Sequence, residues 1–142
     1  MRERPSAGRG STTMKRHGNL FSQIIEYENI VRSHRQARRG KARYQEVQMV
    51  DKTPKVFFDA IQMSLEEQTF RTSPYITKRI FEPKERLIYK LPYYPDRIVH
   101  HAIMNIIQPI WDRIFIYDLY SAIPGKGLHK GSYRLRRFMK DT

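Results

Sequence analysis

The chain has 142 residues, a formal net charge of +13 and a hydrophobic fraction of 39%. This length suits one modest domain with its own core, and the apolar fraction argues against wholesale disorder. The lack of cysteine excludes a disulfide framework and a thiolate zinc site.

The strong positive charge points to an anionic partner. Nucleic acid is the first choice, because phosphate neutralisation by Lys and Arg supplies most non-specific binding. A basic surface without a partner is the alternative. Residues 1–13 have no apolar segment typical of a secretory signal, and no apolar run is long enough to span a bilayer. We therefore expect a cytoplasmic chain with no membrane partner.

The N-terminal third begins with residues 1–13, whose Gly, Ser, Thr and Arg content predicts a disordered tail. Apolar residues then recur at helical spacing, which predicts a helix from Leu20 to about His34. A basic run over residues 32–43 follows. It is either a solvated tail or an arm that faces RNA.

A second helix is predicted to begin at Thr53 and Pro54, a suitable pair for its N-cap and first position. Its apolar face is expected to contain six residues. They are Val56, Phe57, Ala60, Ile61, Ser64 and Leu65.

After Thr69, aromatic and β-branched residues flank the polar tetrad 82–85, and this pattern predicts a β-hairpin. The prolines that follow at 92 and 95 end its second strand, because proline cannot donate to a ladder. Lys78, Lys84 and Arg86 on such a ribbon offer fixed positive charge to a triphosphate. The alternative is a surface hairpin with solvated charges.

A third helix is predicted from an N-cap at Asp96, with Pro109 breaking it and Trp111 in a short continuation. Its apolar positions are Ile98, Ala102, Ile106 and Ile110. His100 and His101 diverge by about 100° on a helix, so a shared metal site is not expected.

The C-terminal part is predicted as an extended aromatic link over 115–120, a turn over 123–127 and a helix over 130–140. The turn is not a P-loop, because Tyr120 stands where the first glycine is required. The glycines instead allow the backbone to approach a ligand closely. Basic residues from Lys126 onward alternate with aromatic ones, a pattern typical of a phosphate-facing surface. Leu135 and Phe138 on the last helix are expected to be buried against further structure.

Three motifs in this order resemble the fingers region of reverse transcriptases, above all those of the diversity-generating retroelement, retron and group II intron lineage. They are Glu82-Pro83-Lys84 with Arg86, Asp96-Arg97 with His100-His101-Ala102, and Gly125-Lys126-Gly127 with His129-Lys130. The resemblance covers about residues 14–140. One departure is Ile123, where many relatives carry arginine.

The resemblance implies an α+β fold over residues 14–142, a mostly helical fingers subdomain with one β-hairpin whose palm sheet is missing. It implies that Arg86 contacts the phosphates of an incoming nucleotide, with Lys78 as a helper from the opposite strand. The residues implied to bind nucleic acid are Lys84, Gly125, Lys126, Gly127, Lys130, Arg134 and Arg137.

The implied partners are an RNA template, a nucleic-acid primer, and the palm and thumb of the same protein. In this family, aspartates that follow the last predicted helix hold two Mg²⁺ ions, and Asp141 is not assigned that role. We therefore expect no cofactor in this chain, and template binding without polymerisation. The alternative is a stand-alone basic RNA-binding protein. A helix-turn-helix DNA-binding protein is a weaker third reading, because no helix pair has the short glycine turn.

Overall fold

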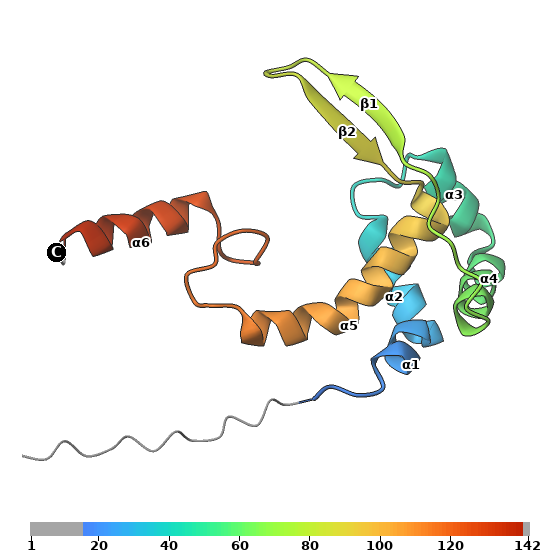
Figure 1. The fold of residues 1–142 in the computed structure, drawn as a ribbon. Helices are drawn as coiled ribbons and strands as arrows, with labels where there is room; N and C mark the ends of the chain where they lie inside the picture. The colour runs from blue at the N-terminus through green and yellow to red at the C-terminus, as the bar shows by residue number, and fades with distance from the viewer. Residues whose placement is uncertain (1–15, 141–142) are drawn as a thin grey trace, which may run out of the picture.

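The computed structural model describes residues 16–140, so the predicted tail at 1–13 lies outside the described residues. The fold is α+β, as predicted, with a two-stranded antiparallel hairpin among helices (Figure 1). In chain order the elements are α1 (Leu20–Ile25), α2 (Tyr27–Ala37), α3 (Gln45–Lys52), α4 (Pro54–Glu66), β1 (Ile76–Ile80), β2 (Arg86–Lys90), the π-helical turn η1 (Tyr93–Arg97), α5 (Ile98–Ile114) and α6 (Leu128–Lys140). Within residues 16–140, no helix has the length and apolar character to cross a membrane.

One hydrophobic core lies between α2, α3, α4, η1 and the first turns of α5, and we call this part of the molecule the body. Burial of apolar surface here is the main stabilising contribution to the fold. The core residues are Ile30, Ala37, Val47, Val50, Phe58, Ile61, Leu65, Tyr93, Ile98 and Val99. The helices of the body are therefore held by packing on one another.

The predicted helix from Leu20 to His34 is wrong in two respects. Glu26 has extended backbone angles (φ −57°, ψ 130°) and separates α1 from α2. The Asn29 side chain stabilises this break, because its amide donates to the carbonyls of Ile24 and Ala102, both at 3.0 Å. The second helix also continues to Ala37, so the first part of the basic run is helical.

The short helix α3 was not predicted. It has eight residues, and Val47 and Val50 are its buried apolar side chains. Two apolar residues are too few to establish a helical period in the sequence. The helix forms because these two side chains complete the core between α4 and η1.

The start of α4 at Pro54 is confirmed, although Thr53 makes no side-chain cap hydrogen bond. Its buried residues are Phe58, Ile61 and Leu65, and Phe58 was not among the six predicted for this face. Val56 and Ala60 were expected on this face but are exposed. The helix packs through one side only, so apolar residues a turn away remain in solvent.

The predicted N-cap role of Asp96 is wrong. Asp96 lies inside η1, is fully buried, and makes no cap hydrogen bond to α5. Its Oδ1 instead accepts the backbone N–H of Ser73 at 2.9 Å. Asp96 therefore fixes the segment that precedes β1 against the start of α5.

Pro109 does not break α5, contrary to the prediction. The helix continues to Ile114, and the N–H of Phe115 closes its last turn by donating to Trp111 O at 2.9 Å. Proline lacks one helical hydrogen bond, but here its ring is on the exposed side of the helix. The buried positions of α5 are confined to its N-terminal half, at Ile98, Val99 and Ala102.

Two arms leave the body, the hairpin near the start of α5 and residues 115–140 after its end (Figure 1). The predicted extended link at 115–120 contains a turn, closed by Leu119 N–H to Ile116 O at 3.2 Å. The predicted turn at 123–127 is confirmed. The last helix begins two residues before its predicted start. Its Leu135 and Phe138 are 60% and 47% exposed in this chain, and their burial against further structure stays a prediction.

Candidate nucleic-acid interface

The hairpin register brings three cations to one face. Lys78 is opposite Ile88, while Arg86 is opposite Ile80 and Lys90 is opposite Ile76. Residues that face each other in an antiparallel pair share one side of the sheet, and diagonal neighbours are about 7–8 Å apart. Lys78 therefore lies diagonally between Arg86 and Lys90, and we call this side the basic face.

On the opposite face of the hairpin, side chains contact one another. Arg79 forms an ion pair with Glu85 at 3.2 Å, and the rings of Tyr75 and Tyr89 contact each other edge to face. Among residues 16–140, no ion pair involves Lys78 or Arg86. Both are exposed, as is Lys84 in the connection between the strands. The predicted nucleotide-binding residues are thus presented together to solvent.

The side chain of Lys126 makes contacts within the protein. Its Nζ donates to the backbone carbonyl of Tyr117 and lies 4.4 Å from the centroid of the Tyr117 ring. A second ring, that of Tyr120, is 5.7 Å away. Cation–π attraction adds to the hydrogen bond. Lys126 therefore stabilises the loop between α5 and α6 as well as carrying charge.

Arg134 is also engaged. Its Nε donates to Asp118 Oδ1 at 3.1 Å, and its guanidinium lies 4.3 Å from the Phe138 ring centroid. The hydroxyl of Tyr120 donates to the same carboxylate oxygen at 2.9 Å. These hydrogen bonds, first that of Tyr120, lower the pKa of Asp118. The ionised Asp118 thereby attaches α6 to the preceding loop.

Lys130 and Arg137 are exposed on α6, and neither takes part in an ion pair among the described residues. The turn before them needs glycine at 125, where φ is +72° and Lys126 N–H bonds to Ile123 O at 3.0 Å. At Gly127 an added Cβ would meet no atom within 4 Å, so its backbone is open to a ligand.

The structure does not bring all predicted residues into one site. The hairpin and α6 lie well apart, separated by the length of α5 (Figure 1). Lys78, Lys84 and Arg86 form one group, while residues 125–137 form another. One strand of nucleic acid would have to follow the molecule from end to end to reach both groups.

The adjacent histidines differ in environment. His100 is exposed, whereas His101 is half-buried. Burial lowers the pKa of His101, and the charges of Arg97 and Lys41 lower it further. Between residues 16 and 140, no group of three or more His, Cys, Asp or Glu side chains is placed to hold a metal ion.

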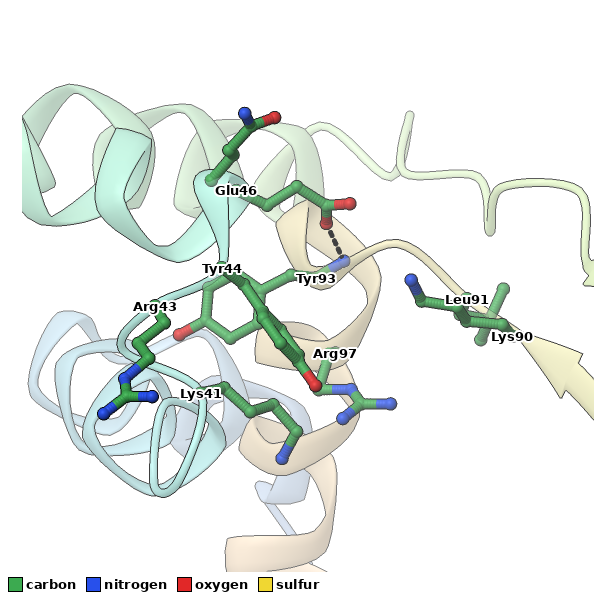
Figure 2. Close-up of a pocket in the computed structure, with 9 residues that line it drawn as sticks. Lys41, Arg43, Tyr44, Glu46, Lys90, Leu91, Tyr93 and Arg97 are labelled. Carbon is green, nitrogen blue, oxygen red and sulfur yellow. Dashed lines mark hydrogen bonds between the residues drawn. The ribbon is translucent and has the colours of Figure 1, made fainter.

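A basic cleft was missed by the sequence interpretation. It has a volume of about 590 Å³ and lies between the α2–α3 loop, the end of β2 and η1 (Figure 2). Its charged and aromatic lining residues include Lys41, Arg43, Tyr44, Glu46, Lys90 and Arg97. The available signals were the basic run at 32–43 and the Asp-Arg pair, but neither shows that these segments meet.

Comparison with protein-family models and with curated protein sequences finds no match to this chain. The likeness to reverse transcriptases thus rests on the motifs in the sequence.

Proposed function

We propose that the chain is the template- and nucleotide-binding fingers portion of an RNA-directed DNA polymerase. The observation that carries the proposal is the basic face of the hairpin, where Lys78 and Arg86 lie together and take part in no ion pair with the residues that the structure describes. The order of the three motifs in the sequence supports the same assignment.

The chemistry of the basic face suits a nucleoside triphosphate. The planar guanidinium of Arg86 can bind two phosphate oxygens at once, and Lys78 adds a compact charge beside it. Fixed cations also stabilise the charge that develops during phosphoryl transfer. Because both strands project from the body, the hairpin can lie over a bound triphosphate (Figure 1).

The second binding surface is α6, which supplies contacts to the nucleic-acid backbone. Lys130 and Arg137 are exposed there, and the Tyr133 ring is 75% exposed between them. A basic groove or helix with interleaved aromatic rings binds single strands by charge and stacking. Template RNA is therefore the partner proposed for this helix.

Polymerisation in this family requires Mg²⁺ held by carboxylates. The described residues do not provide such a ligand group. The proposal is accordingly confined to binding, and no catalytic step is assigned to residues 16–140.

A stand-alone RNA-binding protein is the second candidate, favoured by the net charge of +13 and by basic groups on both arms. The two functions differ in what the hairpin recognises. A fingers region discriminates a triphosphate, whereas a general RNA-binding surface responds to total charge.

The test compares two double variants that remove equal charge. Lys78→Ala with Arg86→Ala alters the basic face, and Lys55→Ala with Arg71→Ala removes two exposed cations elsewhere. We expect the hairpin variant to bind a deoxynucleoside triphosphate about tenfold or more weakly, because two charge-assisted contacts are lost. The control should be nearly unchanged. Equal weakening in both variants would favour the stand-alone RNA-binding protein.

A further inference from the structure

The basic cleft is a concave site, formed where the α2–α3 loop and η1 of the body meet the base of the hairpin, and it shares only Lys90 with the basic face (Figure 2). The α2–α3 loop contributes Lys41, Arg43 and Tyr44, while the base of the hairpin and η1 contribute Lys90 and Arg97. Its volume of about 590 Å³ is within the range of ligand pockets, roughly 300–1,000 Å³.

Four cations line this cleft beside a single carboxylate, so its charge is only partly compensated. Its one acidic lining residue, Glu46, accepts the backbone N–H of Tyr93 (Figure 2). Across residues 16–140, no ion pair involves any of the four cleft cations. Cations that outnumber the carboxylates of a concavity attract an anion, because the low-dielectric walls focus their field.

Two of these cations have restricted side chains. Lys41 and Arg97 are half-buried. Burial lowers the pKa of the neighbouring His101, and the charges of Arg97 and Lys41 lower it further. Both line the cleft, where Figure 2 shows them next to Tyr44. Partly packed stems lose less conformational freedom on binding, so this pair is preorganised for an anion.

Tyr44 gives the cleft an aromatic wall. Its ring is 57% exposed although it lines the cavity. An exposed ring beside a cationic site is the arrangement with which proteins stack a base next to its phosphate. A bare inorganic anion would make no use of this ring, whereas a nucleotide would.

We propose that this cleft binds a nucleoside phosphate, with Lys41 and Arg97 contacting the phosphate and Tyr44 stacking on the base. The ligand is either a free nucleotide or one unit of a single-stranded nucleic acid, since both present the same chemistry. This site goes beyond the proposed function, because the Lys78 and Arg86 pair on the hairpin takes no part in it.

The experiment measures binding of the full chain to adenosine 5′-monophosphate, adenosine, inorganic phosphate and hexa-adenylate. The cleft variant combines Lys41→Ala with Arg97→Gln, which keeps part of the Arg97 stem. The matched control combines Arg39→Ala with Lys52→Ala, two exposed cations outside the cleft. Circular dichroism of each variant verifies the fold, and the hairpin variant Lys78→Ala with Arg86→Ala is measured in parallel.

We expect the cleft variant to bind the monophosphate or hexa-adenylate about tenfold or more weakly, with the control and hairpin variants close to wild type for the monophosphate. Tyr44→Ala should weaken the binding of these ligands about fivefold or more but leave the binding of inorganic phosphate unchanged, and Tyr44→Phe should bind them normally.

Saturable monophosphate binding identifies a free nucleotide as the ligand, and binding of hexa-adenylate alone identifies a strand. Equal losses in the cleft and control variants, or no binding of either ligand, would overturn the proposal. If the cleft variant bound the monophosphate and hexa-adenylate like wild type, while the hairpin variant lost deoxynucleoside triphosphate binding in the test of the proposed function, this site would be overturned and the proposed function would stand.

Discussion

The body and the two arms differ in how they use apolar side chains. In the body, Ile30, Ile61 and Ile98 are at most 1% exposed and pack on one another. In the arms, neither hairpin strand nor α6 contains a buried residue. Stability and the ligand contacts proposed for the arms are therefore separated in space, so charges on the arms can change without disturbing the core.

Polar groups follow the same division. In the body, His34 lies between Asp51 at 2.8 Å and the Tyr93 hydroxyl at 2.9 Å, which links α2, α3 and η1. In the C-terminal arm, Asp118 and Arg134 pair at the surface. Buried hydrogen bonds contribute more than exposed ion pairs, because solvent screens the latter.

The largest expected effect compares a core residue with an arm residue of similar size. Ile61→Ala should lower the free energy of unfolding by about 2–5 kcal/mol, because it leaves a cavity in the core. Leu135→Ala, at an exposed position of α6, should change it by less than about 0.5 kcal/mol. Urea denaturation followed by circular dichroism measures both. Similar losses would show that α6 is part of the cooperative unit.

The second comparison separates free from engaged cations of the C-terminal arm. Binding of single-stranded RNA should weaken about sevenfold or more on a fourfold salt increase if at least two phosphates are neutralised. Lys130→Ala with Arg137→Ala should flatten the salt slope by roughly 1.4, about 0.7 per phosphate. Lys126→Ala with Arg134→Ala should flatten it less, because these side chains already contact Tyr117 and Asp118. A larger change of the salt slope in the Lys126 and Arg134 variant would place the RNA at the loop between α5 and α6.

Local signals made part of this fold predictable. The polar tetrad at 82–85 and the Thr53-Pro54 pair are sufficient to identify the hairpin and the start of α4. The break at Glu26 was not predictable, because it depends on a hydrogen bond from Asn29 to Ala102, 73 residues away. The role of Asp96 likewise depends on a distant partner in Ser73.

The candidate site shows the same limit. Lys78 and Arg86 could be named from charge and family likeness, but their common face requires the strand register. The internal contacts of Lys126 and Arg134 depend on how the 115–127 loop folds back. The cleft was missed because Lys41 and Arg97, distant in sequence, meet only in the folded body.

The third expected effect tests the buried network of the body. Tyr93→Phe should lower stability by about 1 kcal/mol at neutral pH, because the hydrogen bond to His34 is lost. Burial, with a contribution from Asp51, raises the pKa of Tyr93 from 10.0 to about 12. The unfolded chain therefore releases this proton first, and wild-type stability falls between about pH 10 and 12. The difference between the proteins should narrow over that window. A constant difference would contradict the assigned burial effect.

The smallest effect concerns Gly131, where α6 contacts the loop before it. An added Cβ would lie 3.3 Å from Tyr120 Cγ, so the Tyr120 ring must move by a few tenths of an ångström. That ring is only half-buried and belongs to an arm without buried side chains, so it can shift to make room for the added methyl group. Alanine favours a helix over glycine by about 1 kcal/mol.

Gly131→Ala should therefore raise the helical signal of α6 and leave the urea midpoint of the body unchanged. Gly127→Ala is the control, because its added Cβ meets nothing within 4 Å. A lower urea midpoint in Gly131→Ala than in the control would mean that displacing Tyr120 destabilises the core. The arm would then be coupled to the body through α5, and the separation of stability from ligand contacts would fail at this position.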